Sequence, residues 1–239
     1  MTSTTTALVT GANKGLGRET VRRLAGLGWR VFLTARDTTR GTAAAAELAA
    51  AGLDVSFVPL DVTSEESVTD AAELVRASVG RLDVLVNNAG IGGADDTPDR
   101  TRPEDLQEVF EVNVYGPVRV TRVFLPLLRA AESPRIVMVS SGMGSVATVT
   151  HPELGALVSP SLAYPASKAA LNMITTQYAR ALPDIKINAV DPGYTATDLT
   201  DHKGFQTVTD GTDAIVRLAS VGSDGPTGGF FDRTGPAPW

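Results

Sequence analysis

Short apolar runs alternate with longer helical patterns along the chain, and this alternation limits the possible folds more than any other feature. The runs are typical of β-strands, being short and rich in β-branched residues. They lie at residues 7–10, 29–33, 55–58, 82–86, 135–139 and 185–190. Helical patterns separate them at residues 16–27, 38–51, 65–79, 103–131 and 161–182, and a last helix near 211–220 precedes a short apolar stretch at 230–231.

Several of the runs are apolar at every position and not only at alternate ones. Strands of this kind are buried on both faces, as in parallel sheets that are covered by helices. Repeated strand–helix units connect through right-handed crossovers. We therefore predict an α/β protein with a doubly wound Rossmann fold, a mostly parallel sheet and helices on both faces. Residues 1–239 contain no linker, charge block or repeat, which indicates a single domain.

Composition excludes several classes of function. The chain has 239 residues with a formal net charge of -6, which argues against nucleic acid or an anionic membrane as the partner. No apolar run approaches the roughly 20 residues of a membrane span. With no cysteine and two histidines, no Cys-based or His-rich metal site is expected. The first six residues lack the basic and apolar parts of a signal peptide, so we expect a cytoplasmic protein.

A glycine-rich turn at residues 10–17, Thr-Gly-Ala-Asn-Lys-Gly-Leu-Gly, follows the first run directly. Gly11 would permit a tight turn, Gly15 would let backbone N–H groups approach a pyrophosphate, and Gly17 would allow the helix to pack closely on the strand. A glycine cluster can also be a purely structural turn. The strand that precedes this turn and the helix that begins inside it favour a dinucleotide site.

The end of the second run indicates which dinucleotide is bound. A carboxylate there would bind a free ribose hydroxyl, whereas cations suit a 2′-phosphate. Ala35 stands where the acid would be expected, and Arg36 follows it with donors matched to phosphate. Lys14 could converge on the same group, Arg40 is a weaker candidate, and Asp37 is a better helix cap than ribose ligand. The residues therefore favour NADP(H) over NAD(H).

Tyr164 and Lys168 are four residues apart at the start of the helix expected over 161–182, so their side chains leave the same face. An unperturbed phenol has a pKa near 10. An ammonium roughly 4 Å away would stabilise the phenolate by about 4 kcal/mol, or roughly 3 pKa units. The pair would then exchange protons near neutral pH. Alone, the same spacing also fits a solvated helix face.

Seven motifs in this order resemble the short-chain dehydrogenase/reductase family, and particularly its carbonyl-reductase-like members that use NADPH. They are Thr10-Gly11-x-x-x-Gly15-x-Gly17, Asp61-Val62, Asn87-Asn88-Ala89-Gly90, Asn113, Ser140-Ser141, Tyr164-x-x-x-Lys168 and Pro192-Gly193-x-x-x-Thr197. The segment from Leu33 to Gly41 is similar to that of carbonyl reductases. The resemblance implies about seven strands in the order 3-2-1-4-5-6-7.

The resemblance also implies catalytic roles. Tyr164 would be the general acid that protonates a carbonyl oxygen, or the base in the reverse direction. Lys168 would lower the pKa of Tyr164 and bind the nicotinamide ribose. Ser141, the second of the serine pair, would polarise the substrate oxygen. Asn113 would hold a water that links Lys168 to solvent, although a polar residue on a helix face is the simpler interpretation of Asn113 taken alone.

The cofactor contacts follow from the same motifs. Asp61 and Val62 would flank the adenine, and Asn87 with Gly90 would line the cleft. A Thr after a turn is often only a helix cap, which weakens the case for Thr195 and Thr197. The full predicted set is Gly11, Asn13, Lys14, Gly15, Leu16, Gly17, Arg36, Arg40, Asp61, Val62, Asn87, Ala89, Gly90, Tyr164, Lys168, Pro192, Gly193, Thr195 and Thr197.

The substrate is less defined. Ser141 and Tyr164 are 23 residues apart (164 − 141), more than in many family members, and the extra residues at 149–161 would form a substrate-facing loop. We expect substrate loops near 143–162 and 194–212. Met143, Val149 and Tyr194 are the candidate contacts, and their character suits a fairly hydrophobic small molecule.

The predicted function is reversible, NADPH-dependent reduction of a ketone or aldehyde to an alcohol, in which the cofactor carries the hydride. One alternative is NADP-dependent oxidation of a secondary alcohol in a biosynthetic pathway. The other is a non-catalytic NADP-binding regulator, but such proteins often lose a catalytic residue and all four are present here. The resemblance also allows a homodimer or homotetramer that pairs through the helices at 103–131 and 161–182.

Overall fold

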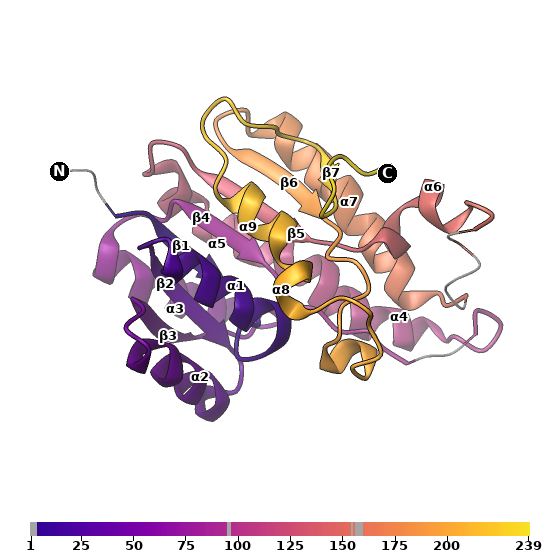
Figure 1. Cartoon of the computed structure of the whole chain (residues 1–239), viewed down its shortest axis with the longest axis horizontal. Coiled ribbons are helices and arrows are strands. Elements are labelled where there is room, and N and C mark those ends of the chain that lie inside the picture. The colour runs from indigo at the N-terminus through magenta and orange to yellow at the C-terminus, as the bar shows by residue number, and fades with distance from the viewer. Residues whose placement is uncertain (1–3, 95–96, 154, 156–159) are drawn as a thin grey trace.

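A seven-stranded sheet runs through the centre of the molecule in the order β3-β2-β1-β4-β5-β6-β7 (Figure 1). Every neighbouring pair of strands is parallel. This computed structural model describes residues 4–94, 97–153, 155 and 160–239. The strands are β1 (Thr6–Val9), β2 (Arg30–Ala35), β3 (Val55–Pro59), β4 (Val84–Asn87), β5 (Arg135–Val139), β6 (Lys186–Val190) and β7 (Phe230–Phe231). The predicted fold class and strand order are confirmed.

Helices connect successive strands. The long ones are α1 (Gly15–Gly26), α2 (Thr38–Ala50), α3 (Glu65–Val79), α4 (Pro103–Phe110), α5 (Gly116–Arg129) and α7 (Ala163–Ala181). Shorter helical segments are η1 (Glu111–Tyr115), η2 (Gly142–Gly144), α6 (Val146–Val149), η4 (Asp198–Thr200), α8 (Val208–Gly211) and α9 (Asp213–Ala219). The helix expected over 103–131 is therefore two α-helices joined by η1, which is a π-helix.

The sheet separates two apolar layers. Helices α1, α2 and α9 pack on one face, and α3, α5 and α7 pack on the other. Within β1, Ala7 and Val9 belong to the first layer and Leu8 to the second. All three are fully buried, as the continuous apolar runs predicted for a sheet covered on both sides.

Local sequence fixes where the helices begin and end. The Asp37 carboxylate accepts a hydrogen bond from the backbone N–H of Arg40 (2.9 Å) and caps α2, as predicted. Ser64 caps α3 by accepting from the Ser67 N–H (3.2 Å). Gly80 ends α3 in the left-handed conformation, with φ of 71°. These caps define the register in which each helix covers the sheet.

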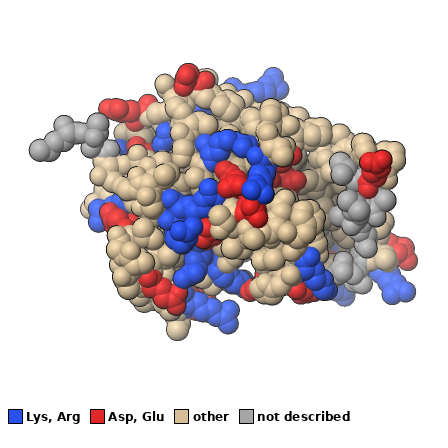
Figure 2. Space-filling model, in the orientation of Figure 1, with Lys and Arg blue, Asp and Glu red and all other residues tan. Residues whose placement is uncertain are grey.

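Charges of both signs are intermixed on the face shown in Figure 2. Among the ion pairs of the protein, Arg233 lies between Asp210 (2.8 Å) and Asp213 (2.9 Å). Among the helices in the described parts of the chain, none has the length and apolar character needed to cross a bilayer.

The carboxyl ends of all the strands lie at one edge of the sheet, because all the strands are parallel. The predicted motifs follow these ends: the glycine turn after β1, Arg36 after β2, Asp61 after β3 and Asn88 after β4. Ligands of open α/β sheets bind at this edge. The fold therefore brings together motifs that are far apart in the sequence.

Candidate active site

The glycine turn after β1 is packed so tightly that it excludes side chains at two of its positions. Gly11 has φ of 61°, and a Cβ on it would lie 2.9 Å from the Ala89 Cα. A Cβ on Gly17 would lie 2.5 Å from Asn88 Nδ2 and 2.7 Å from the Gly11 carbonyl. Gly15 has φ of 55° and opens α1. The turn thus has the close packing and the exposed helix N-terminus that the glycine spacing predicts.

Asn88 and Thr10 hold this turn against the end of β4. Asn88 Nδ2 donates to the carbonyls of Thr10 (2.8 Å) and Gly11 (3.1 Å). Thr10 Oγ1 accepts from the backbone N–H groups of Asn88 (2.9 Å) and Ala89 (3.0 Å). Neither residue was among the predicted site residues, although both stand inside the quoted motifs.

A cleft of about 490 Å³ opens beside the turn. Eleven predicted cofactor residues line it: Gly11, Asn13, Lys14, Gly15, Leu16, Gly17, Arg36, Asp61, Val62, Ala89 and Gly90. Thr197 also lines it, as predicted. The prediction missed several other residues of the wall, namely Ala35, Leu60, Thr63, Asn88, Ile91, Gly92, Val112, Asp198 and Leu199.

Asn87 does not line the cleft with Gly90 as expected. Its side chain is buried between the sheet and α5, where Nδ2 donates to Thr121 Oγ1 of α5 (3.2 Å). The reason is strand alternation: Leu85 and Asn87 point to the same face of β4, the one that α5 covers. The side chain that stabilises the glycine turn is that of Asn88.

Two cations lie at the end of the cleft beside β2. Arg36 is exposed, and Lys14 forms an ion pair with Asp198 (2.5 Å) in which both side chains are more than half exposed. Arg40 is not part of the cleft wall and lies beside Asp37, with 3.3 Å between Nε and Oδ2. Ala35 stands at the end of β2, where a carboxylate that binds a free ribose hydroxyl would be expected.

Asn113 lies at the centre of the π-helix η1 and is fully buried. Its Oδ1 accepts from the Ile91 N–H (2.9 Å), while its Nδ2 donates to the Ile91 carbonyl (2.9 Å) and to Ser167 Oγ of α7 (3.1 Å). The amide thus joins three segments. The π-turn is marked by the Gly116 N–H donating to the Glu111 carbonyl, and Pro117, which has no N–H, signals the irregularity in the sequence.

Lys168 is buried and reaches the cleft from α7. Its Nζ donates to the Val139 carbonyl at the end of β5 (2.8 Å). A Cβ placed on Gly90 would be 3.6 Å from this Nζ and 3.3 Å from Asn113 Oδ1. Lys168 and Asn113 therefore meet at the cleft wall, and a side chain at position 90 would lie against both.

The Tyr164–Lys168 pair differs from the electrostatic prediction. Lys168 Nζ lies 5.5 Å from the centroid of the Tyr164 ring. Burial raises the pKa of Tyr164 to about 12, and burial lowers the pKa of Lys168 to about 8. Desolvation disfavours both charged forms, so the expected stabilisation of the phenolate by the neighbouring ammonium is wrong for the protein without ligand.

The two serines after β5 have separate roles. Ser140 is buried and donates to Asn172 Oδ1 of α7 (2.5 Å), which makes it structural. Ser141 lies beside the Tyr164 side chain, and this polar neighbour opposes the rise in the tyrosine pKa. Ser141 Oγ also accepts from the Met143 N–H (3.2 Å). The structure therefore brings the predicted Ser–Tyr pair into contact.

The predicted substrate loops lie on the same side of the sheet. Tyr194 is half exposed, and its ring contacts that of Phe205 edge to face (6.0 Å between centroids). Val149 is exposed at the end of α6, and Met143 is half-buried in η2. Residues 154 and 156–159 of the inserted loop lie outside the described residues.

Of the residues predicted to contact the cofactor from the loop after β6, one lines the cleft and three do not. Thr195 is buried, and its Oγ1 donates to the Pro192 carbonyl (3.1 Å). Neither Thr195 nor Pro192 nor Gly193 is part of the cleft wall. Thr197, by contrast, lies across from Gly15, whose Cβ would be 3.6 Å from Thr197 Cγ2.

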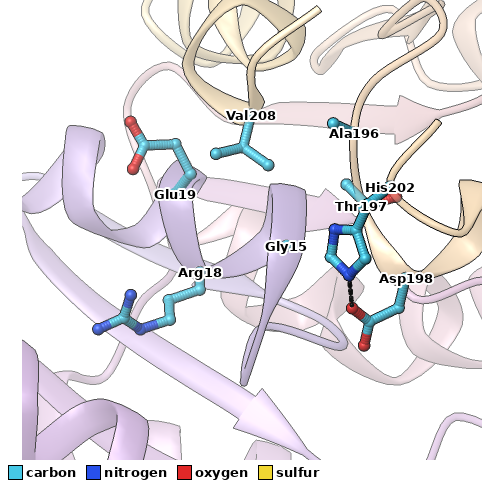
Figure 3. A pocket seen from close by; sticks show the side chains of 8 residues that line it. All are labelled: Gly15, Arg18, Glu19, Ala196, Thr197, Asp198, His202 and Val208. Atoms are coloured by element: carbon cyan, nitrogen blue, oxygen red, sulfur yellow. Dashed lines mark ion pairs between the residues drawn. The ribbon is translucent and has the colours of Figure 1, made fainter. Parts of the chain in front are cut away.

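A smaller cavity of about 220 Å³ adjoins the cleft, and Gly15, Thr197 and Asp198 line both. Within it the imidazole of His202 faces Asp198, with 3.0 Å between Nε2 and Oδ1, while Arg18 extends from α1 away from this pair (Figure 3). Arg18 instead pairs with Glu47 of α2 (2.6 Å). Asp198 therefore has two partners, the Lys14 ammonium and the His202 imidazole, and links η4 to the glycine turn.

Comparison with known proteins matches this arrangement to one family. The family model for short chain dehydrogenases matches residues 5–206. The chain belongs to the short-chain dehydrogenase/reductase family. Its members are oxidoreductases, which agrees with the order of motifs and with the contact between Ser141 and Tyr164.

Relatives span nearly the whole chain. The (+)-neomenthol dehydrogenase of Arabidopsis thaliana is 35% identical over 282 residues, covering 95% of this chain and 95% of that protein. Salutaridine reductase of Papaver bracteatum is 33% identical and covers 95% of this chain and 93% of its own length. The NADPH-bound carbonyl reductase from chicken fatty liver superposes with a TM-score of 0.87 at 30% identity, and the match covers 99% of each chain.

The buried Asn113 amide yields a first prediction. Asn113→Leu leaves the backbone N–H and carbonyl of Ile91 without partners, and each unpaired buried group costs about 1–3 kcal/mol. We expect the free energy of unfolding to fall by about 2–5 kcal/mol in urea titrations. Gln177→Leu, on an exposed part of α7, is the control and should change it by less than about 0.5 kcal/mol. Equal effects of the two changes on the free energy of unfolding would contradict the structural role assigned to the Asn113 amide.

Proposed function

We propose that the protein is an NADPH-dependent reductase that converts a ketone or aldehyde to an alcohol. The observation that carries the proposal is the juxtaposition of Lys168 with the cleft at Gly90, together with the proximity of Ser141 to Tyr164 on the same sheet edge. This combination places a proton donor, a group that polarises a carbonyl and a buried cation beside a nucleotide-sized cleft. Such an arrangement is suited to hydride and proton addition across a C=O bond.

The cleft fits a dinucleotide phosphate at both ends. The glycine turn leaves no room for side chains where a pyrophosphate would approach the N-terminus of α1. At the β2 end, Arg36 and Lys14 line the wall where a ribose carboxylate ligand would otherwise stand. Exposed ion pairs contribute about 0–1 kcal/mol, so Lys14 can leave Asp198 for a phosphate at little cost. When bound there, NADPH would supply the hydride.

The protonated state of Tyr164 supports its assignment as the proton donor for reduction. With its pKa raised to about 12, the phenol holds its proton throughout the neutral range. Reduction of a carbonyl requires a proton donor, whereas oxidation of an alcohol requires a base. We therefore assign Tyr164 as the general acid, and Ser141 as the donor that orients the carbonyl oxygen. Asn113 would position Lys168 and the Ile91 segment beside them.

The apolar side chains around the site support an apolar substrate. Tyr194, Phe205, Leu199 and Val149 are exposed, and Leu199 lies across the cleft from Gly92, whose Cβ would be 3.4 Å away. Two relatives, neomenthol dehydrogenase and salutaridine reductase, are named for bulky, largely apolar compounds. We propose a carbonyl compound of that character. Association into a homodimer or homotetramer stays a prediction, supported by the exposed Tyr115 and Met173 on the helices expected to pair.

Arg36 provides the test of cofactor choice. Arg36→Ala removes the cation at the 2′-phosphate position, and a charge-assisted hydrogen bond contributes about 1.5–3 kcal/mol. We expect the KM for NADPH to rise about 10- to 100-fold while the KM for NADH changes little. Steady-state kinetics with both cofactors measure this. Arg76→Ala, on the exposed face of α3, is the matched control. A preference for NADH in the unmodified protein would contradict the assignment.

Tyr164 provides the test of the chemistry. Tyr164→Phe removes the hydroxyl but keeps the ring, and loss of a general acid costs about 10²- to 10⁴-fold in rate. We expect kcat for reduction of a panel of apolar ketones and aldehydes to fall by that factor, followed by NADPH absorbance. Tyr115→Phe, at an exposed phenol, serves as the comparison and should retain full activity. Turnover that is undiminished by Tyr164→Phe would refute the assigned proton donor.

The low pKa of Lys168 predicts the pH dependence. Burial lowers this pKa to about 8, so the ammonium is present below that pH and is lost as the pH rises through it. If the ammonium holds the cofactor, kcat/KM for NADPH falls above about pH 8, because kcat/KM reports ionisations of the free enzyme. Tyr164, at about 12, adds no limb in this range. The measurement is kcat/KM for NADPH from about pH 6 to about pH 10, and a flat profile contradicts the role of the Lys168 ammonium in holding the cofactor.

A further inference from the structure

Asp191 is a carboxylate at the carboxyl end of β6 that none of the proposed catalytic roles uses. Its backbone N–H donates to the Phe231 carbonyl (2.8 Å), which extends the pairing of β6 with β7. Its carboxylate points back across the sheet edge. Oδ1 accepts from the Gly193 N–H (2.9 Å), and the carboxylate also lies against the backbone of Gly142. Two turns that follow neighbouring strands therefore share one side chain.

The turn after β5 is held to β6 on both sides of Ser141. Before it, the Ser140 N–H donates to the Val190 carbonyl (2.7 Å). After it, the backbone N–H of Gly142 lies near the Asp191 carboxylate and stabilises its charged form. The approach is close, because a Cβ on Gly142 would lie 2.7 Å from Asp191 Oδ2. The backbone of Ser141 is thus fixed between two consecutive attachments to β6.

We propose that Asp191 is a positioning residue of the catalytic centre: its carboxylate holds the Ser141–Gly142 turn to the Pro192–Gly193 turn and so fixes where the Ser141 hydroxyl meets Tyr164. The proposal rests on the function proposed above, since it matters for catalysis only if Ser141 and Tyr164 act on a carbonyl. A free turn of glycines and serines would let the Ser141 hydroxyl sample many positions. Displacement of a catalytic group by about 1 Å can cost about 100-fold in rate.

The electrostatics of Asp191 agree with this role. Among the described residues no cation forms an ion pair with it, and the titratable groups that face it are Tyr164 of α7 and Asp232 after β7. Burial raises the pKa of Asp191, and the charge of its carboxylate contributes to the raised pKa of Tyr164. The carboxylate thus both anchors the serine turn and keeps the tyrosine proton in place.

The experiment combines Asp191→Ala with Ser141→Ala. In the otherwise unmodified enzyme, Asp191→Ala should lower kcat about 10- to 100-fold and leave the KM for NADPH within about twofold. In the Ser141→Ala background it should change kcat by less than about threefold, since the hydroxyl that it positions is gone. The same fold-loss in both backgrounds overturns the proposal. Asp191→Asn keeps the shape and one acceptor, so its kcat should lie between that of the unmodified enzyme and that of Asp191→Ala. The same comparison in the two backgrounds is made with Asp191→Asn if the Ala variant does not fold.

Asp83 provides a matched control at the opposite edge of the sheet. Its carboxylate accepts from the Thr6 N–H (2.7 Å) and so ties β1 to β4 far from the site. Asp83→Ala should lower stability without the loss of kcat. If it lowers kcat as Asp191→Ala does, the effect of Asp191 is general destabilisation and the proposal fails.

Hydrogen exchange separates this proposal from the proposed function. In the protein without ligand, Asp191→Ala should speed amide exchange at Gly142 and Gly193, whereas Asp83→Ala should not. Unchanged exchange overturns the positioning role whatever the enzyme's activity. Conversely, turnover that survives Tyr164→Phe would overturn the proposed function. Faster exchange at Gly142 in Asp191→Ala would even then support the link between Asp191 and the Ser141–Gly142 turn.

Discussion

The hydrogen bond from the Lys168 ammonium to the Val139 carbonyl is the contact on which the candidate site depends. A buried ammonium is costly to desolvate, so its position is set by the few groups that can compensate it. This bond fixes α7 against the end of β5. Ser140 reinforces the same junction through Asn172, and Tyr164 lies one helical turn before Lys168. This contact therefore fixes Lys168, and with it Tyr164, relative to the end of β5 that leads into Ser141.

Burial then determines the charges at the site more than the pairing of Tyr164 with Lys168 does. An estimate from two charges at a fixed separation includes their attraction but not the cost of removing each from water. In the folded protein burial of Tyr164 makes its ionisation costly, and Asp191 adds a negative charge nearby. Both effects keep the phenol neutral. A neutral phenol beside Ser141 is a proton donor, which suits the reduction of a carbonyl.

The sequence predicts the sheet and most of the cleft because both depend on short-range patterns. Continuous apolar runs identify the strands, and parallel strands bring their carboxyl ends, with the motifs that follow them, to one edge. Side-chain direction was harder to foresee. Asn87 continues the face of Leu85 and enters the core, which strict alternation along β4 indicates in retrospect. The pairing of Lys14 with Asp198 joins residues 184 positions apart, so local periodicity does not reveal it. The π-turn at Asn113 interrupts a continuous helical pattern, and Pro117 is a local signal of it that periodicity does not include.

The donors of Lys168 connect this packing to the proposed function. An ammonium has three N–H donors. In the described part of the chain the Val139 carbonyl accepts one of them, and the Nζ lies at the wall of the cleft beside Gly90. Buried donors without partners cost about 1–3 kcal/mol each, and this cost contributes to the lowered pKa of the lysine. Ribose hydroxyls in the cleft would satisfy these donors and favour the charged form. Cofactor binding and protonation of Lys168 would then stabilise each other, because each favours the same state of the site.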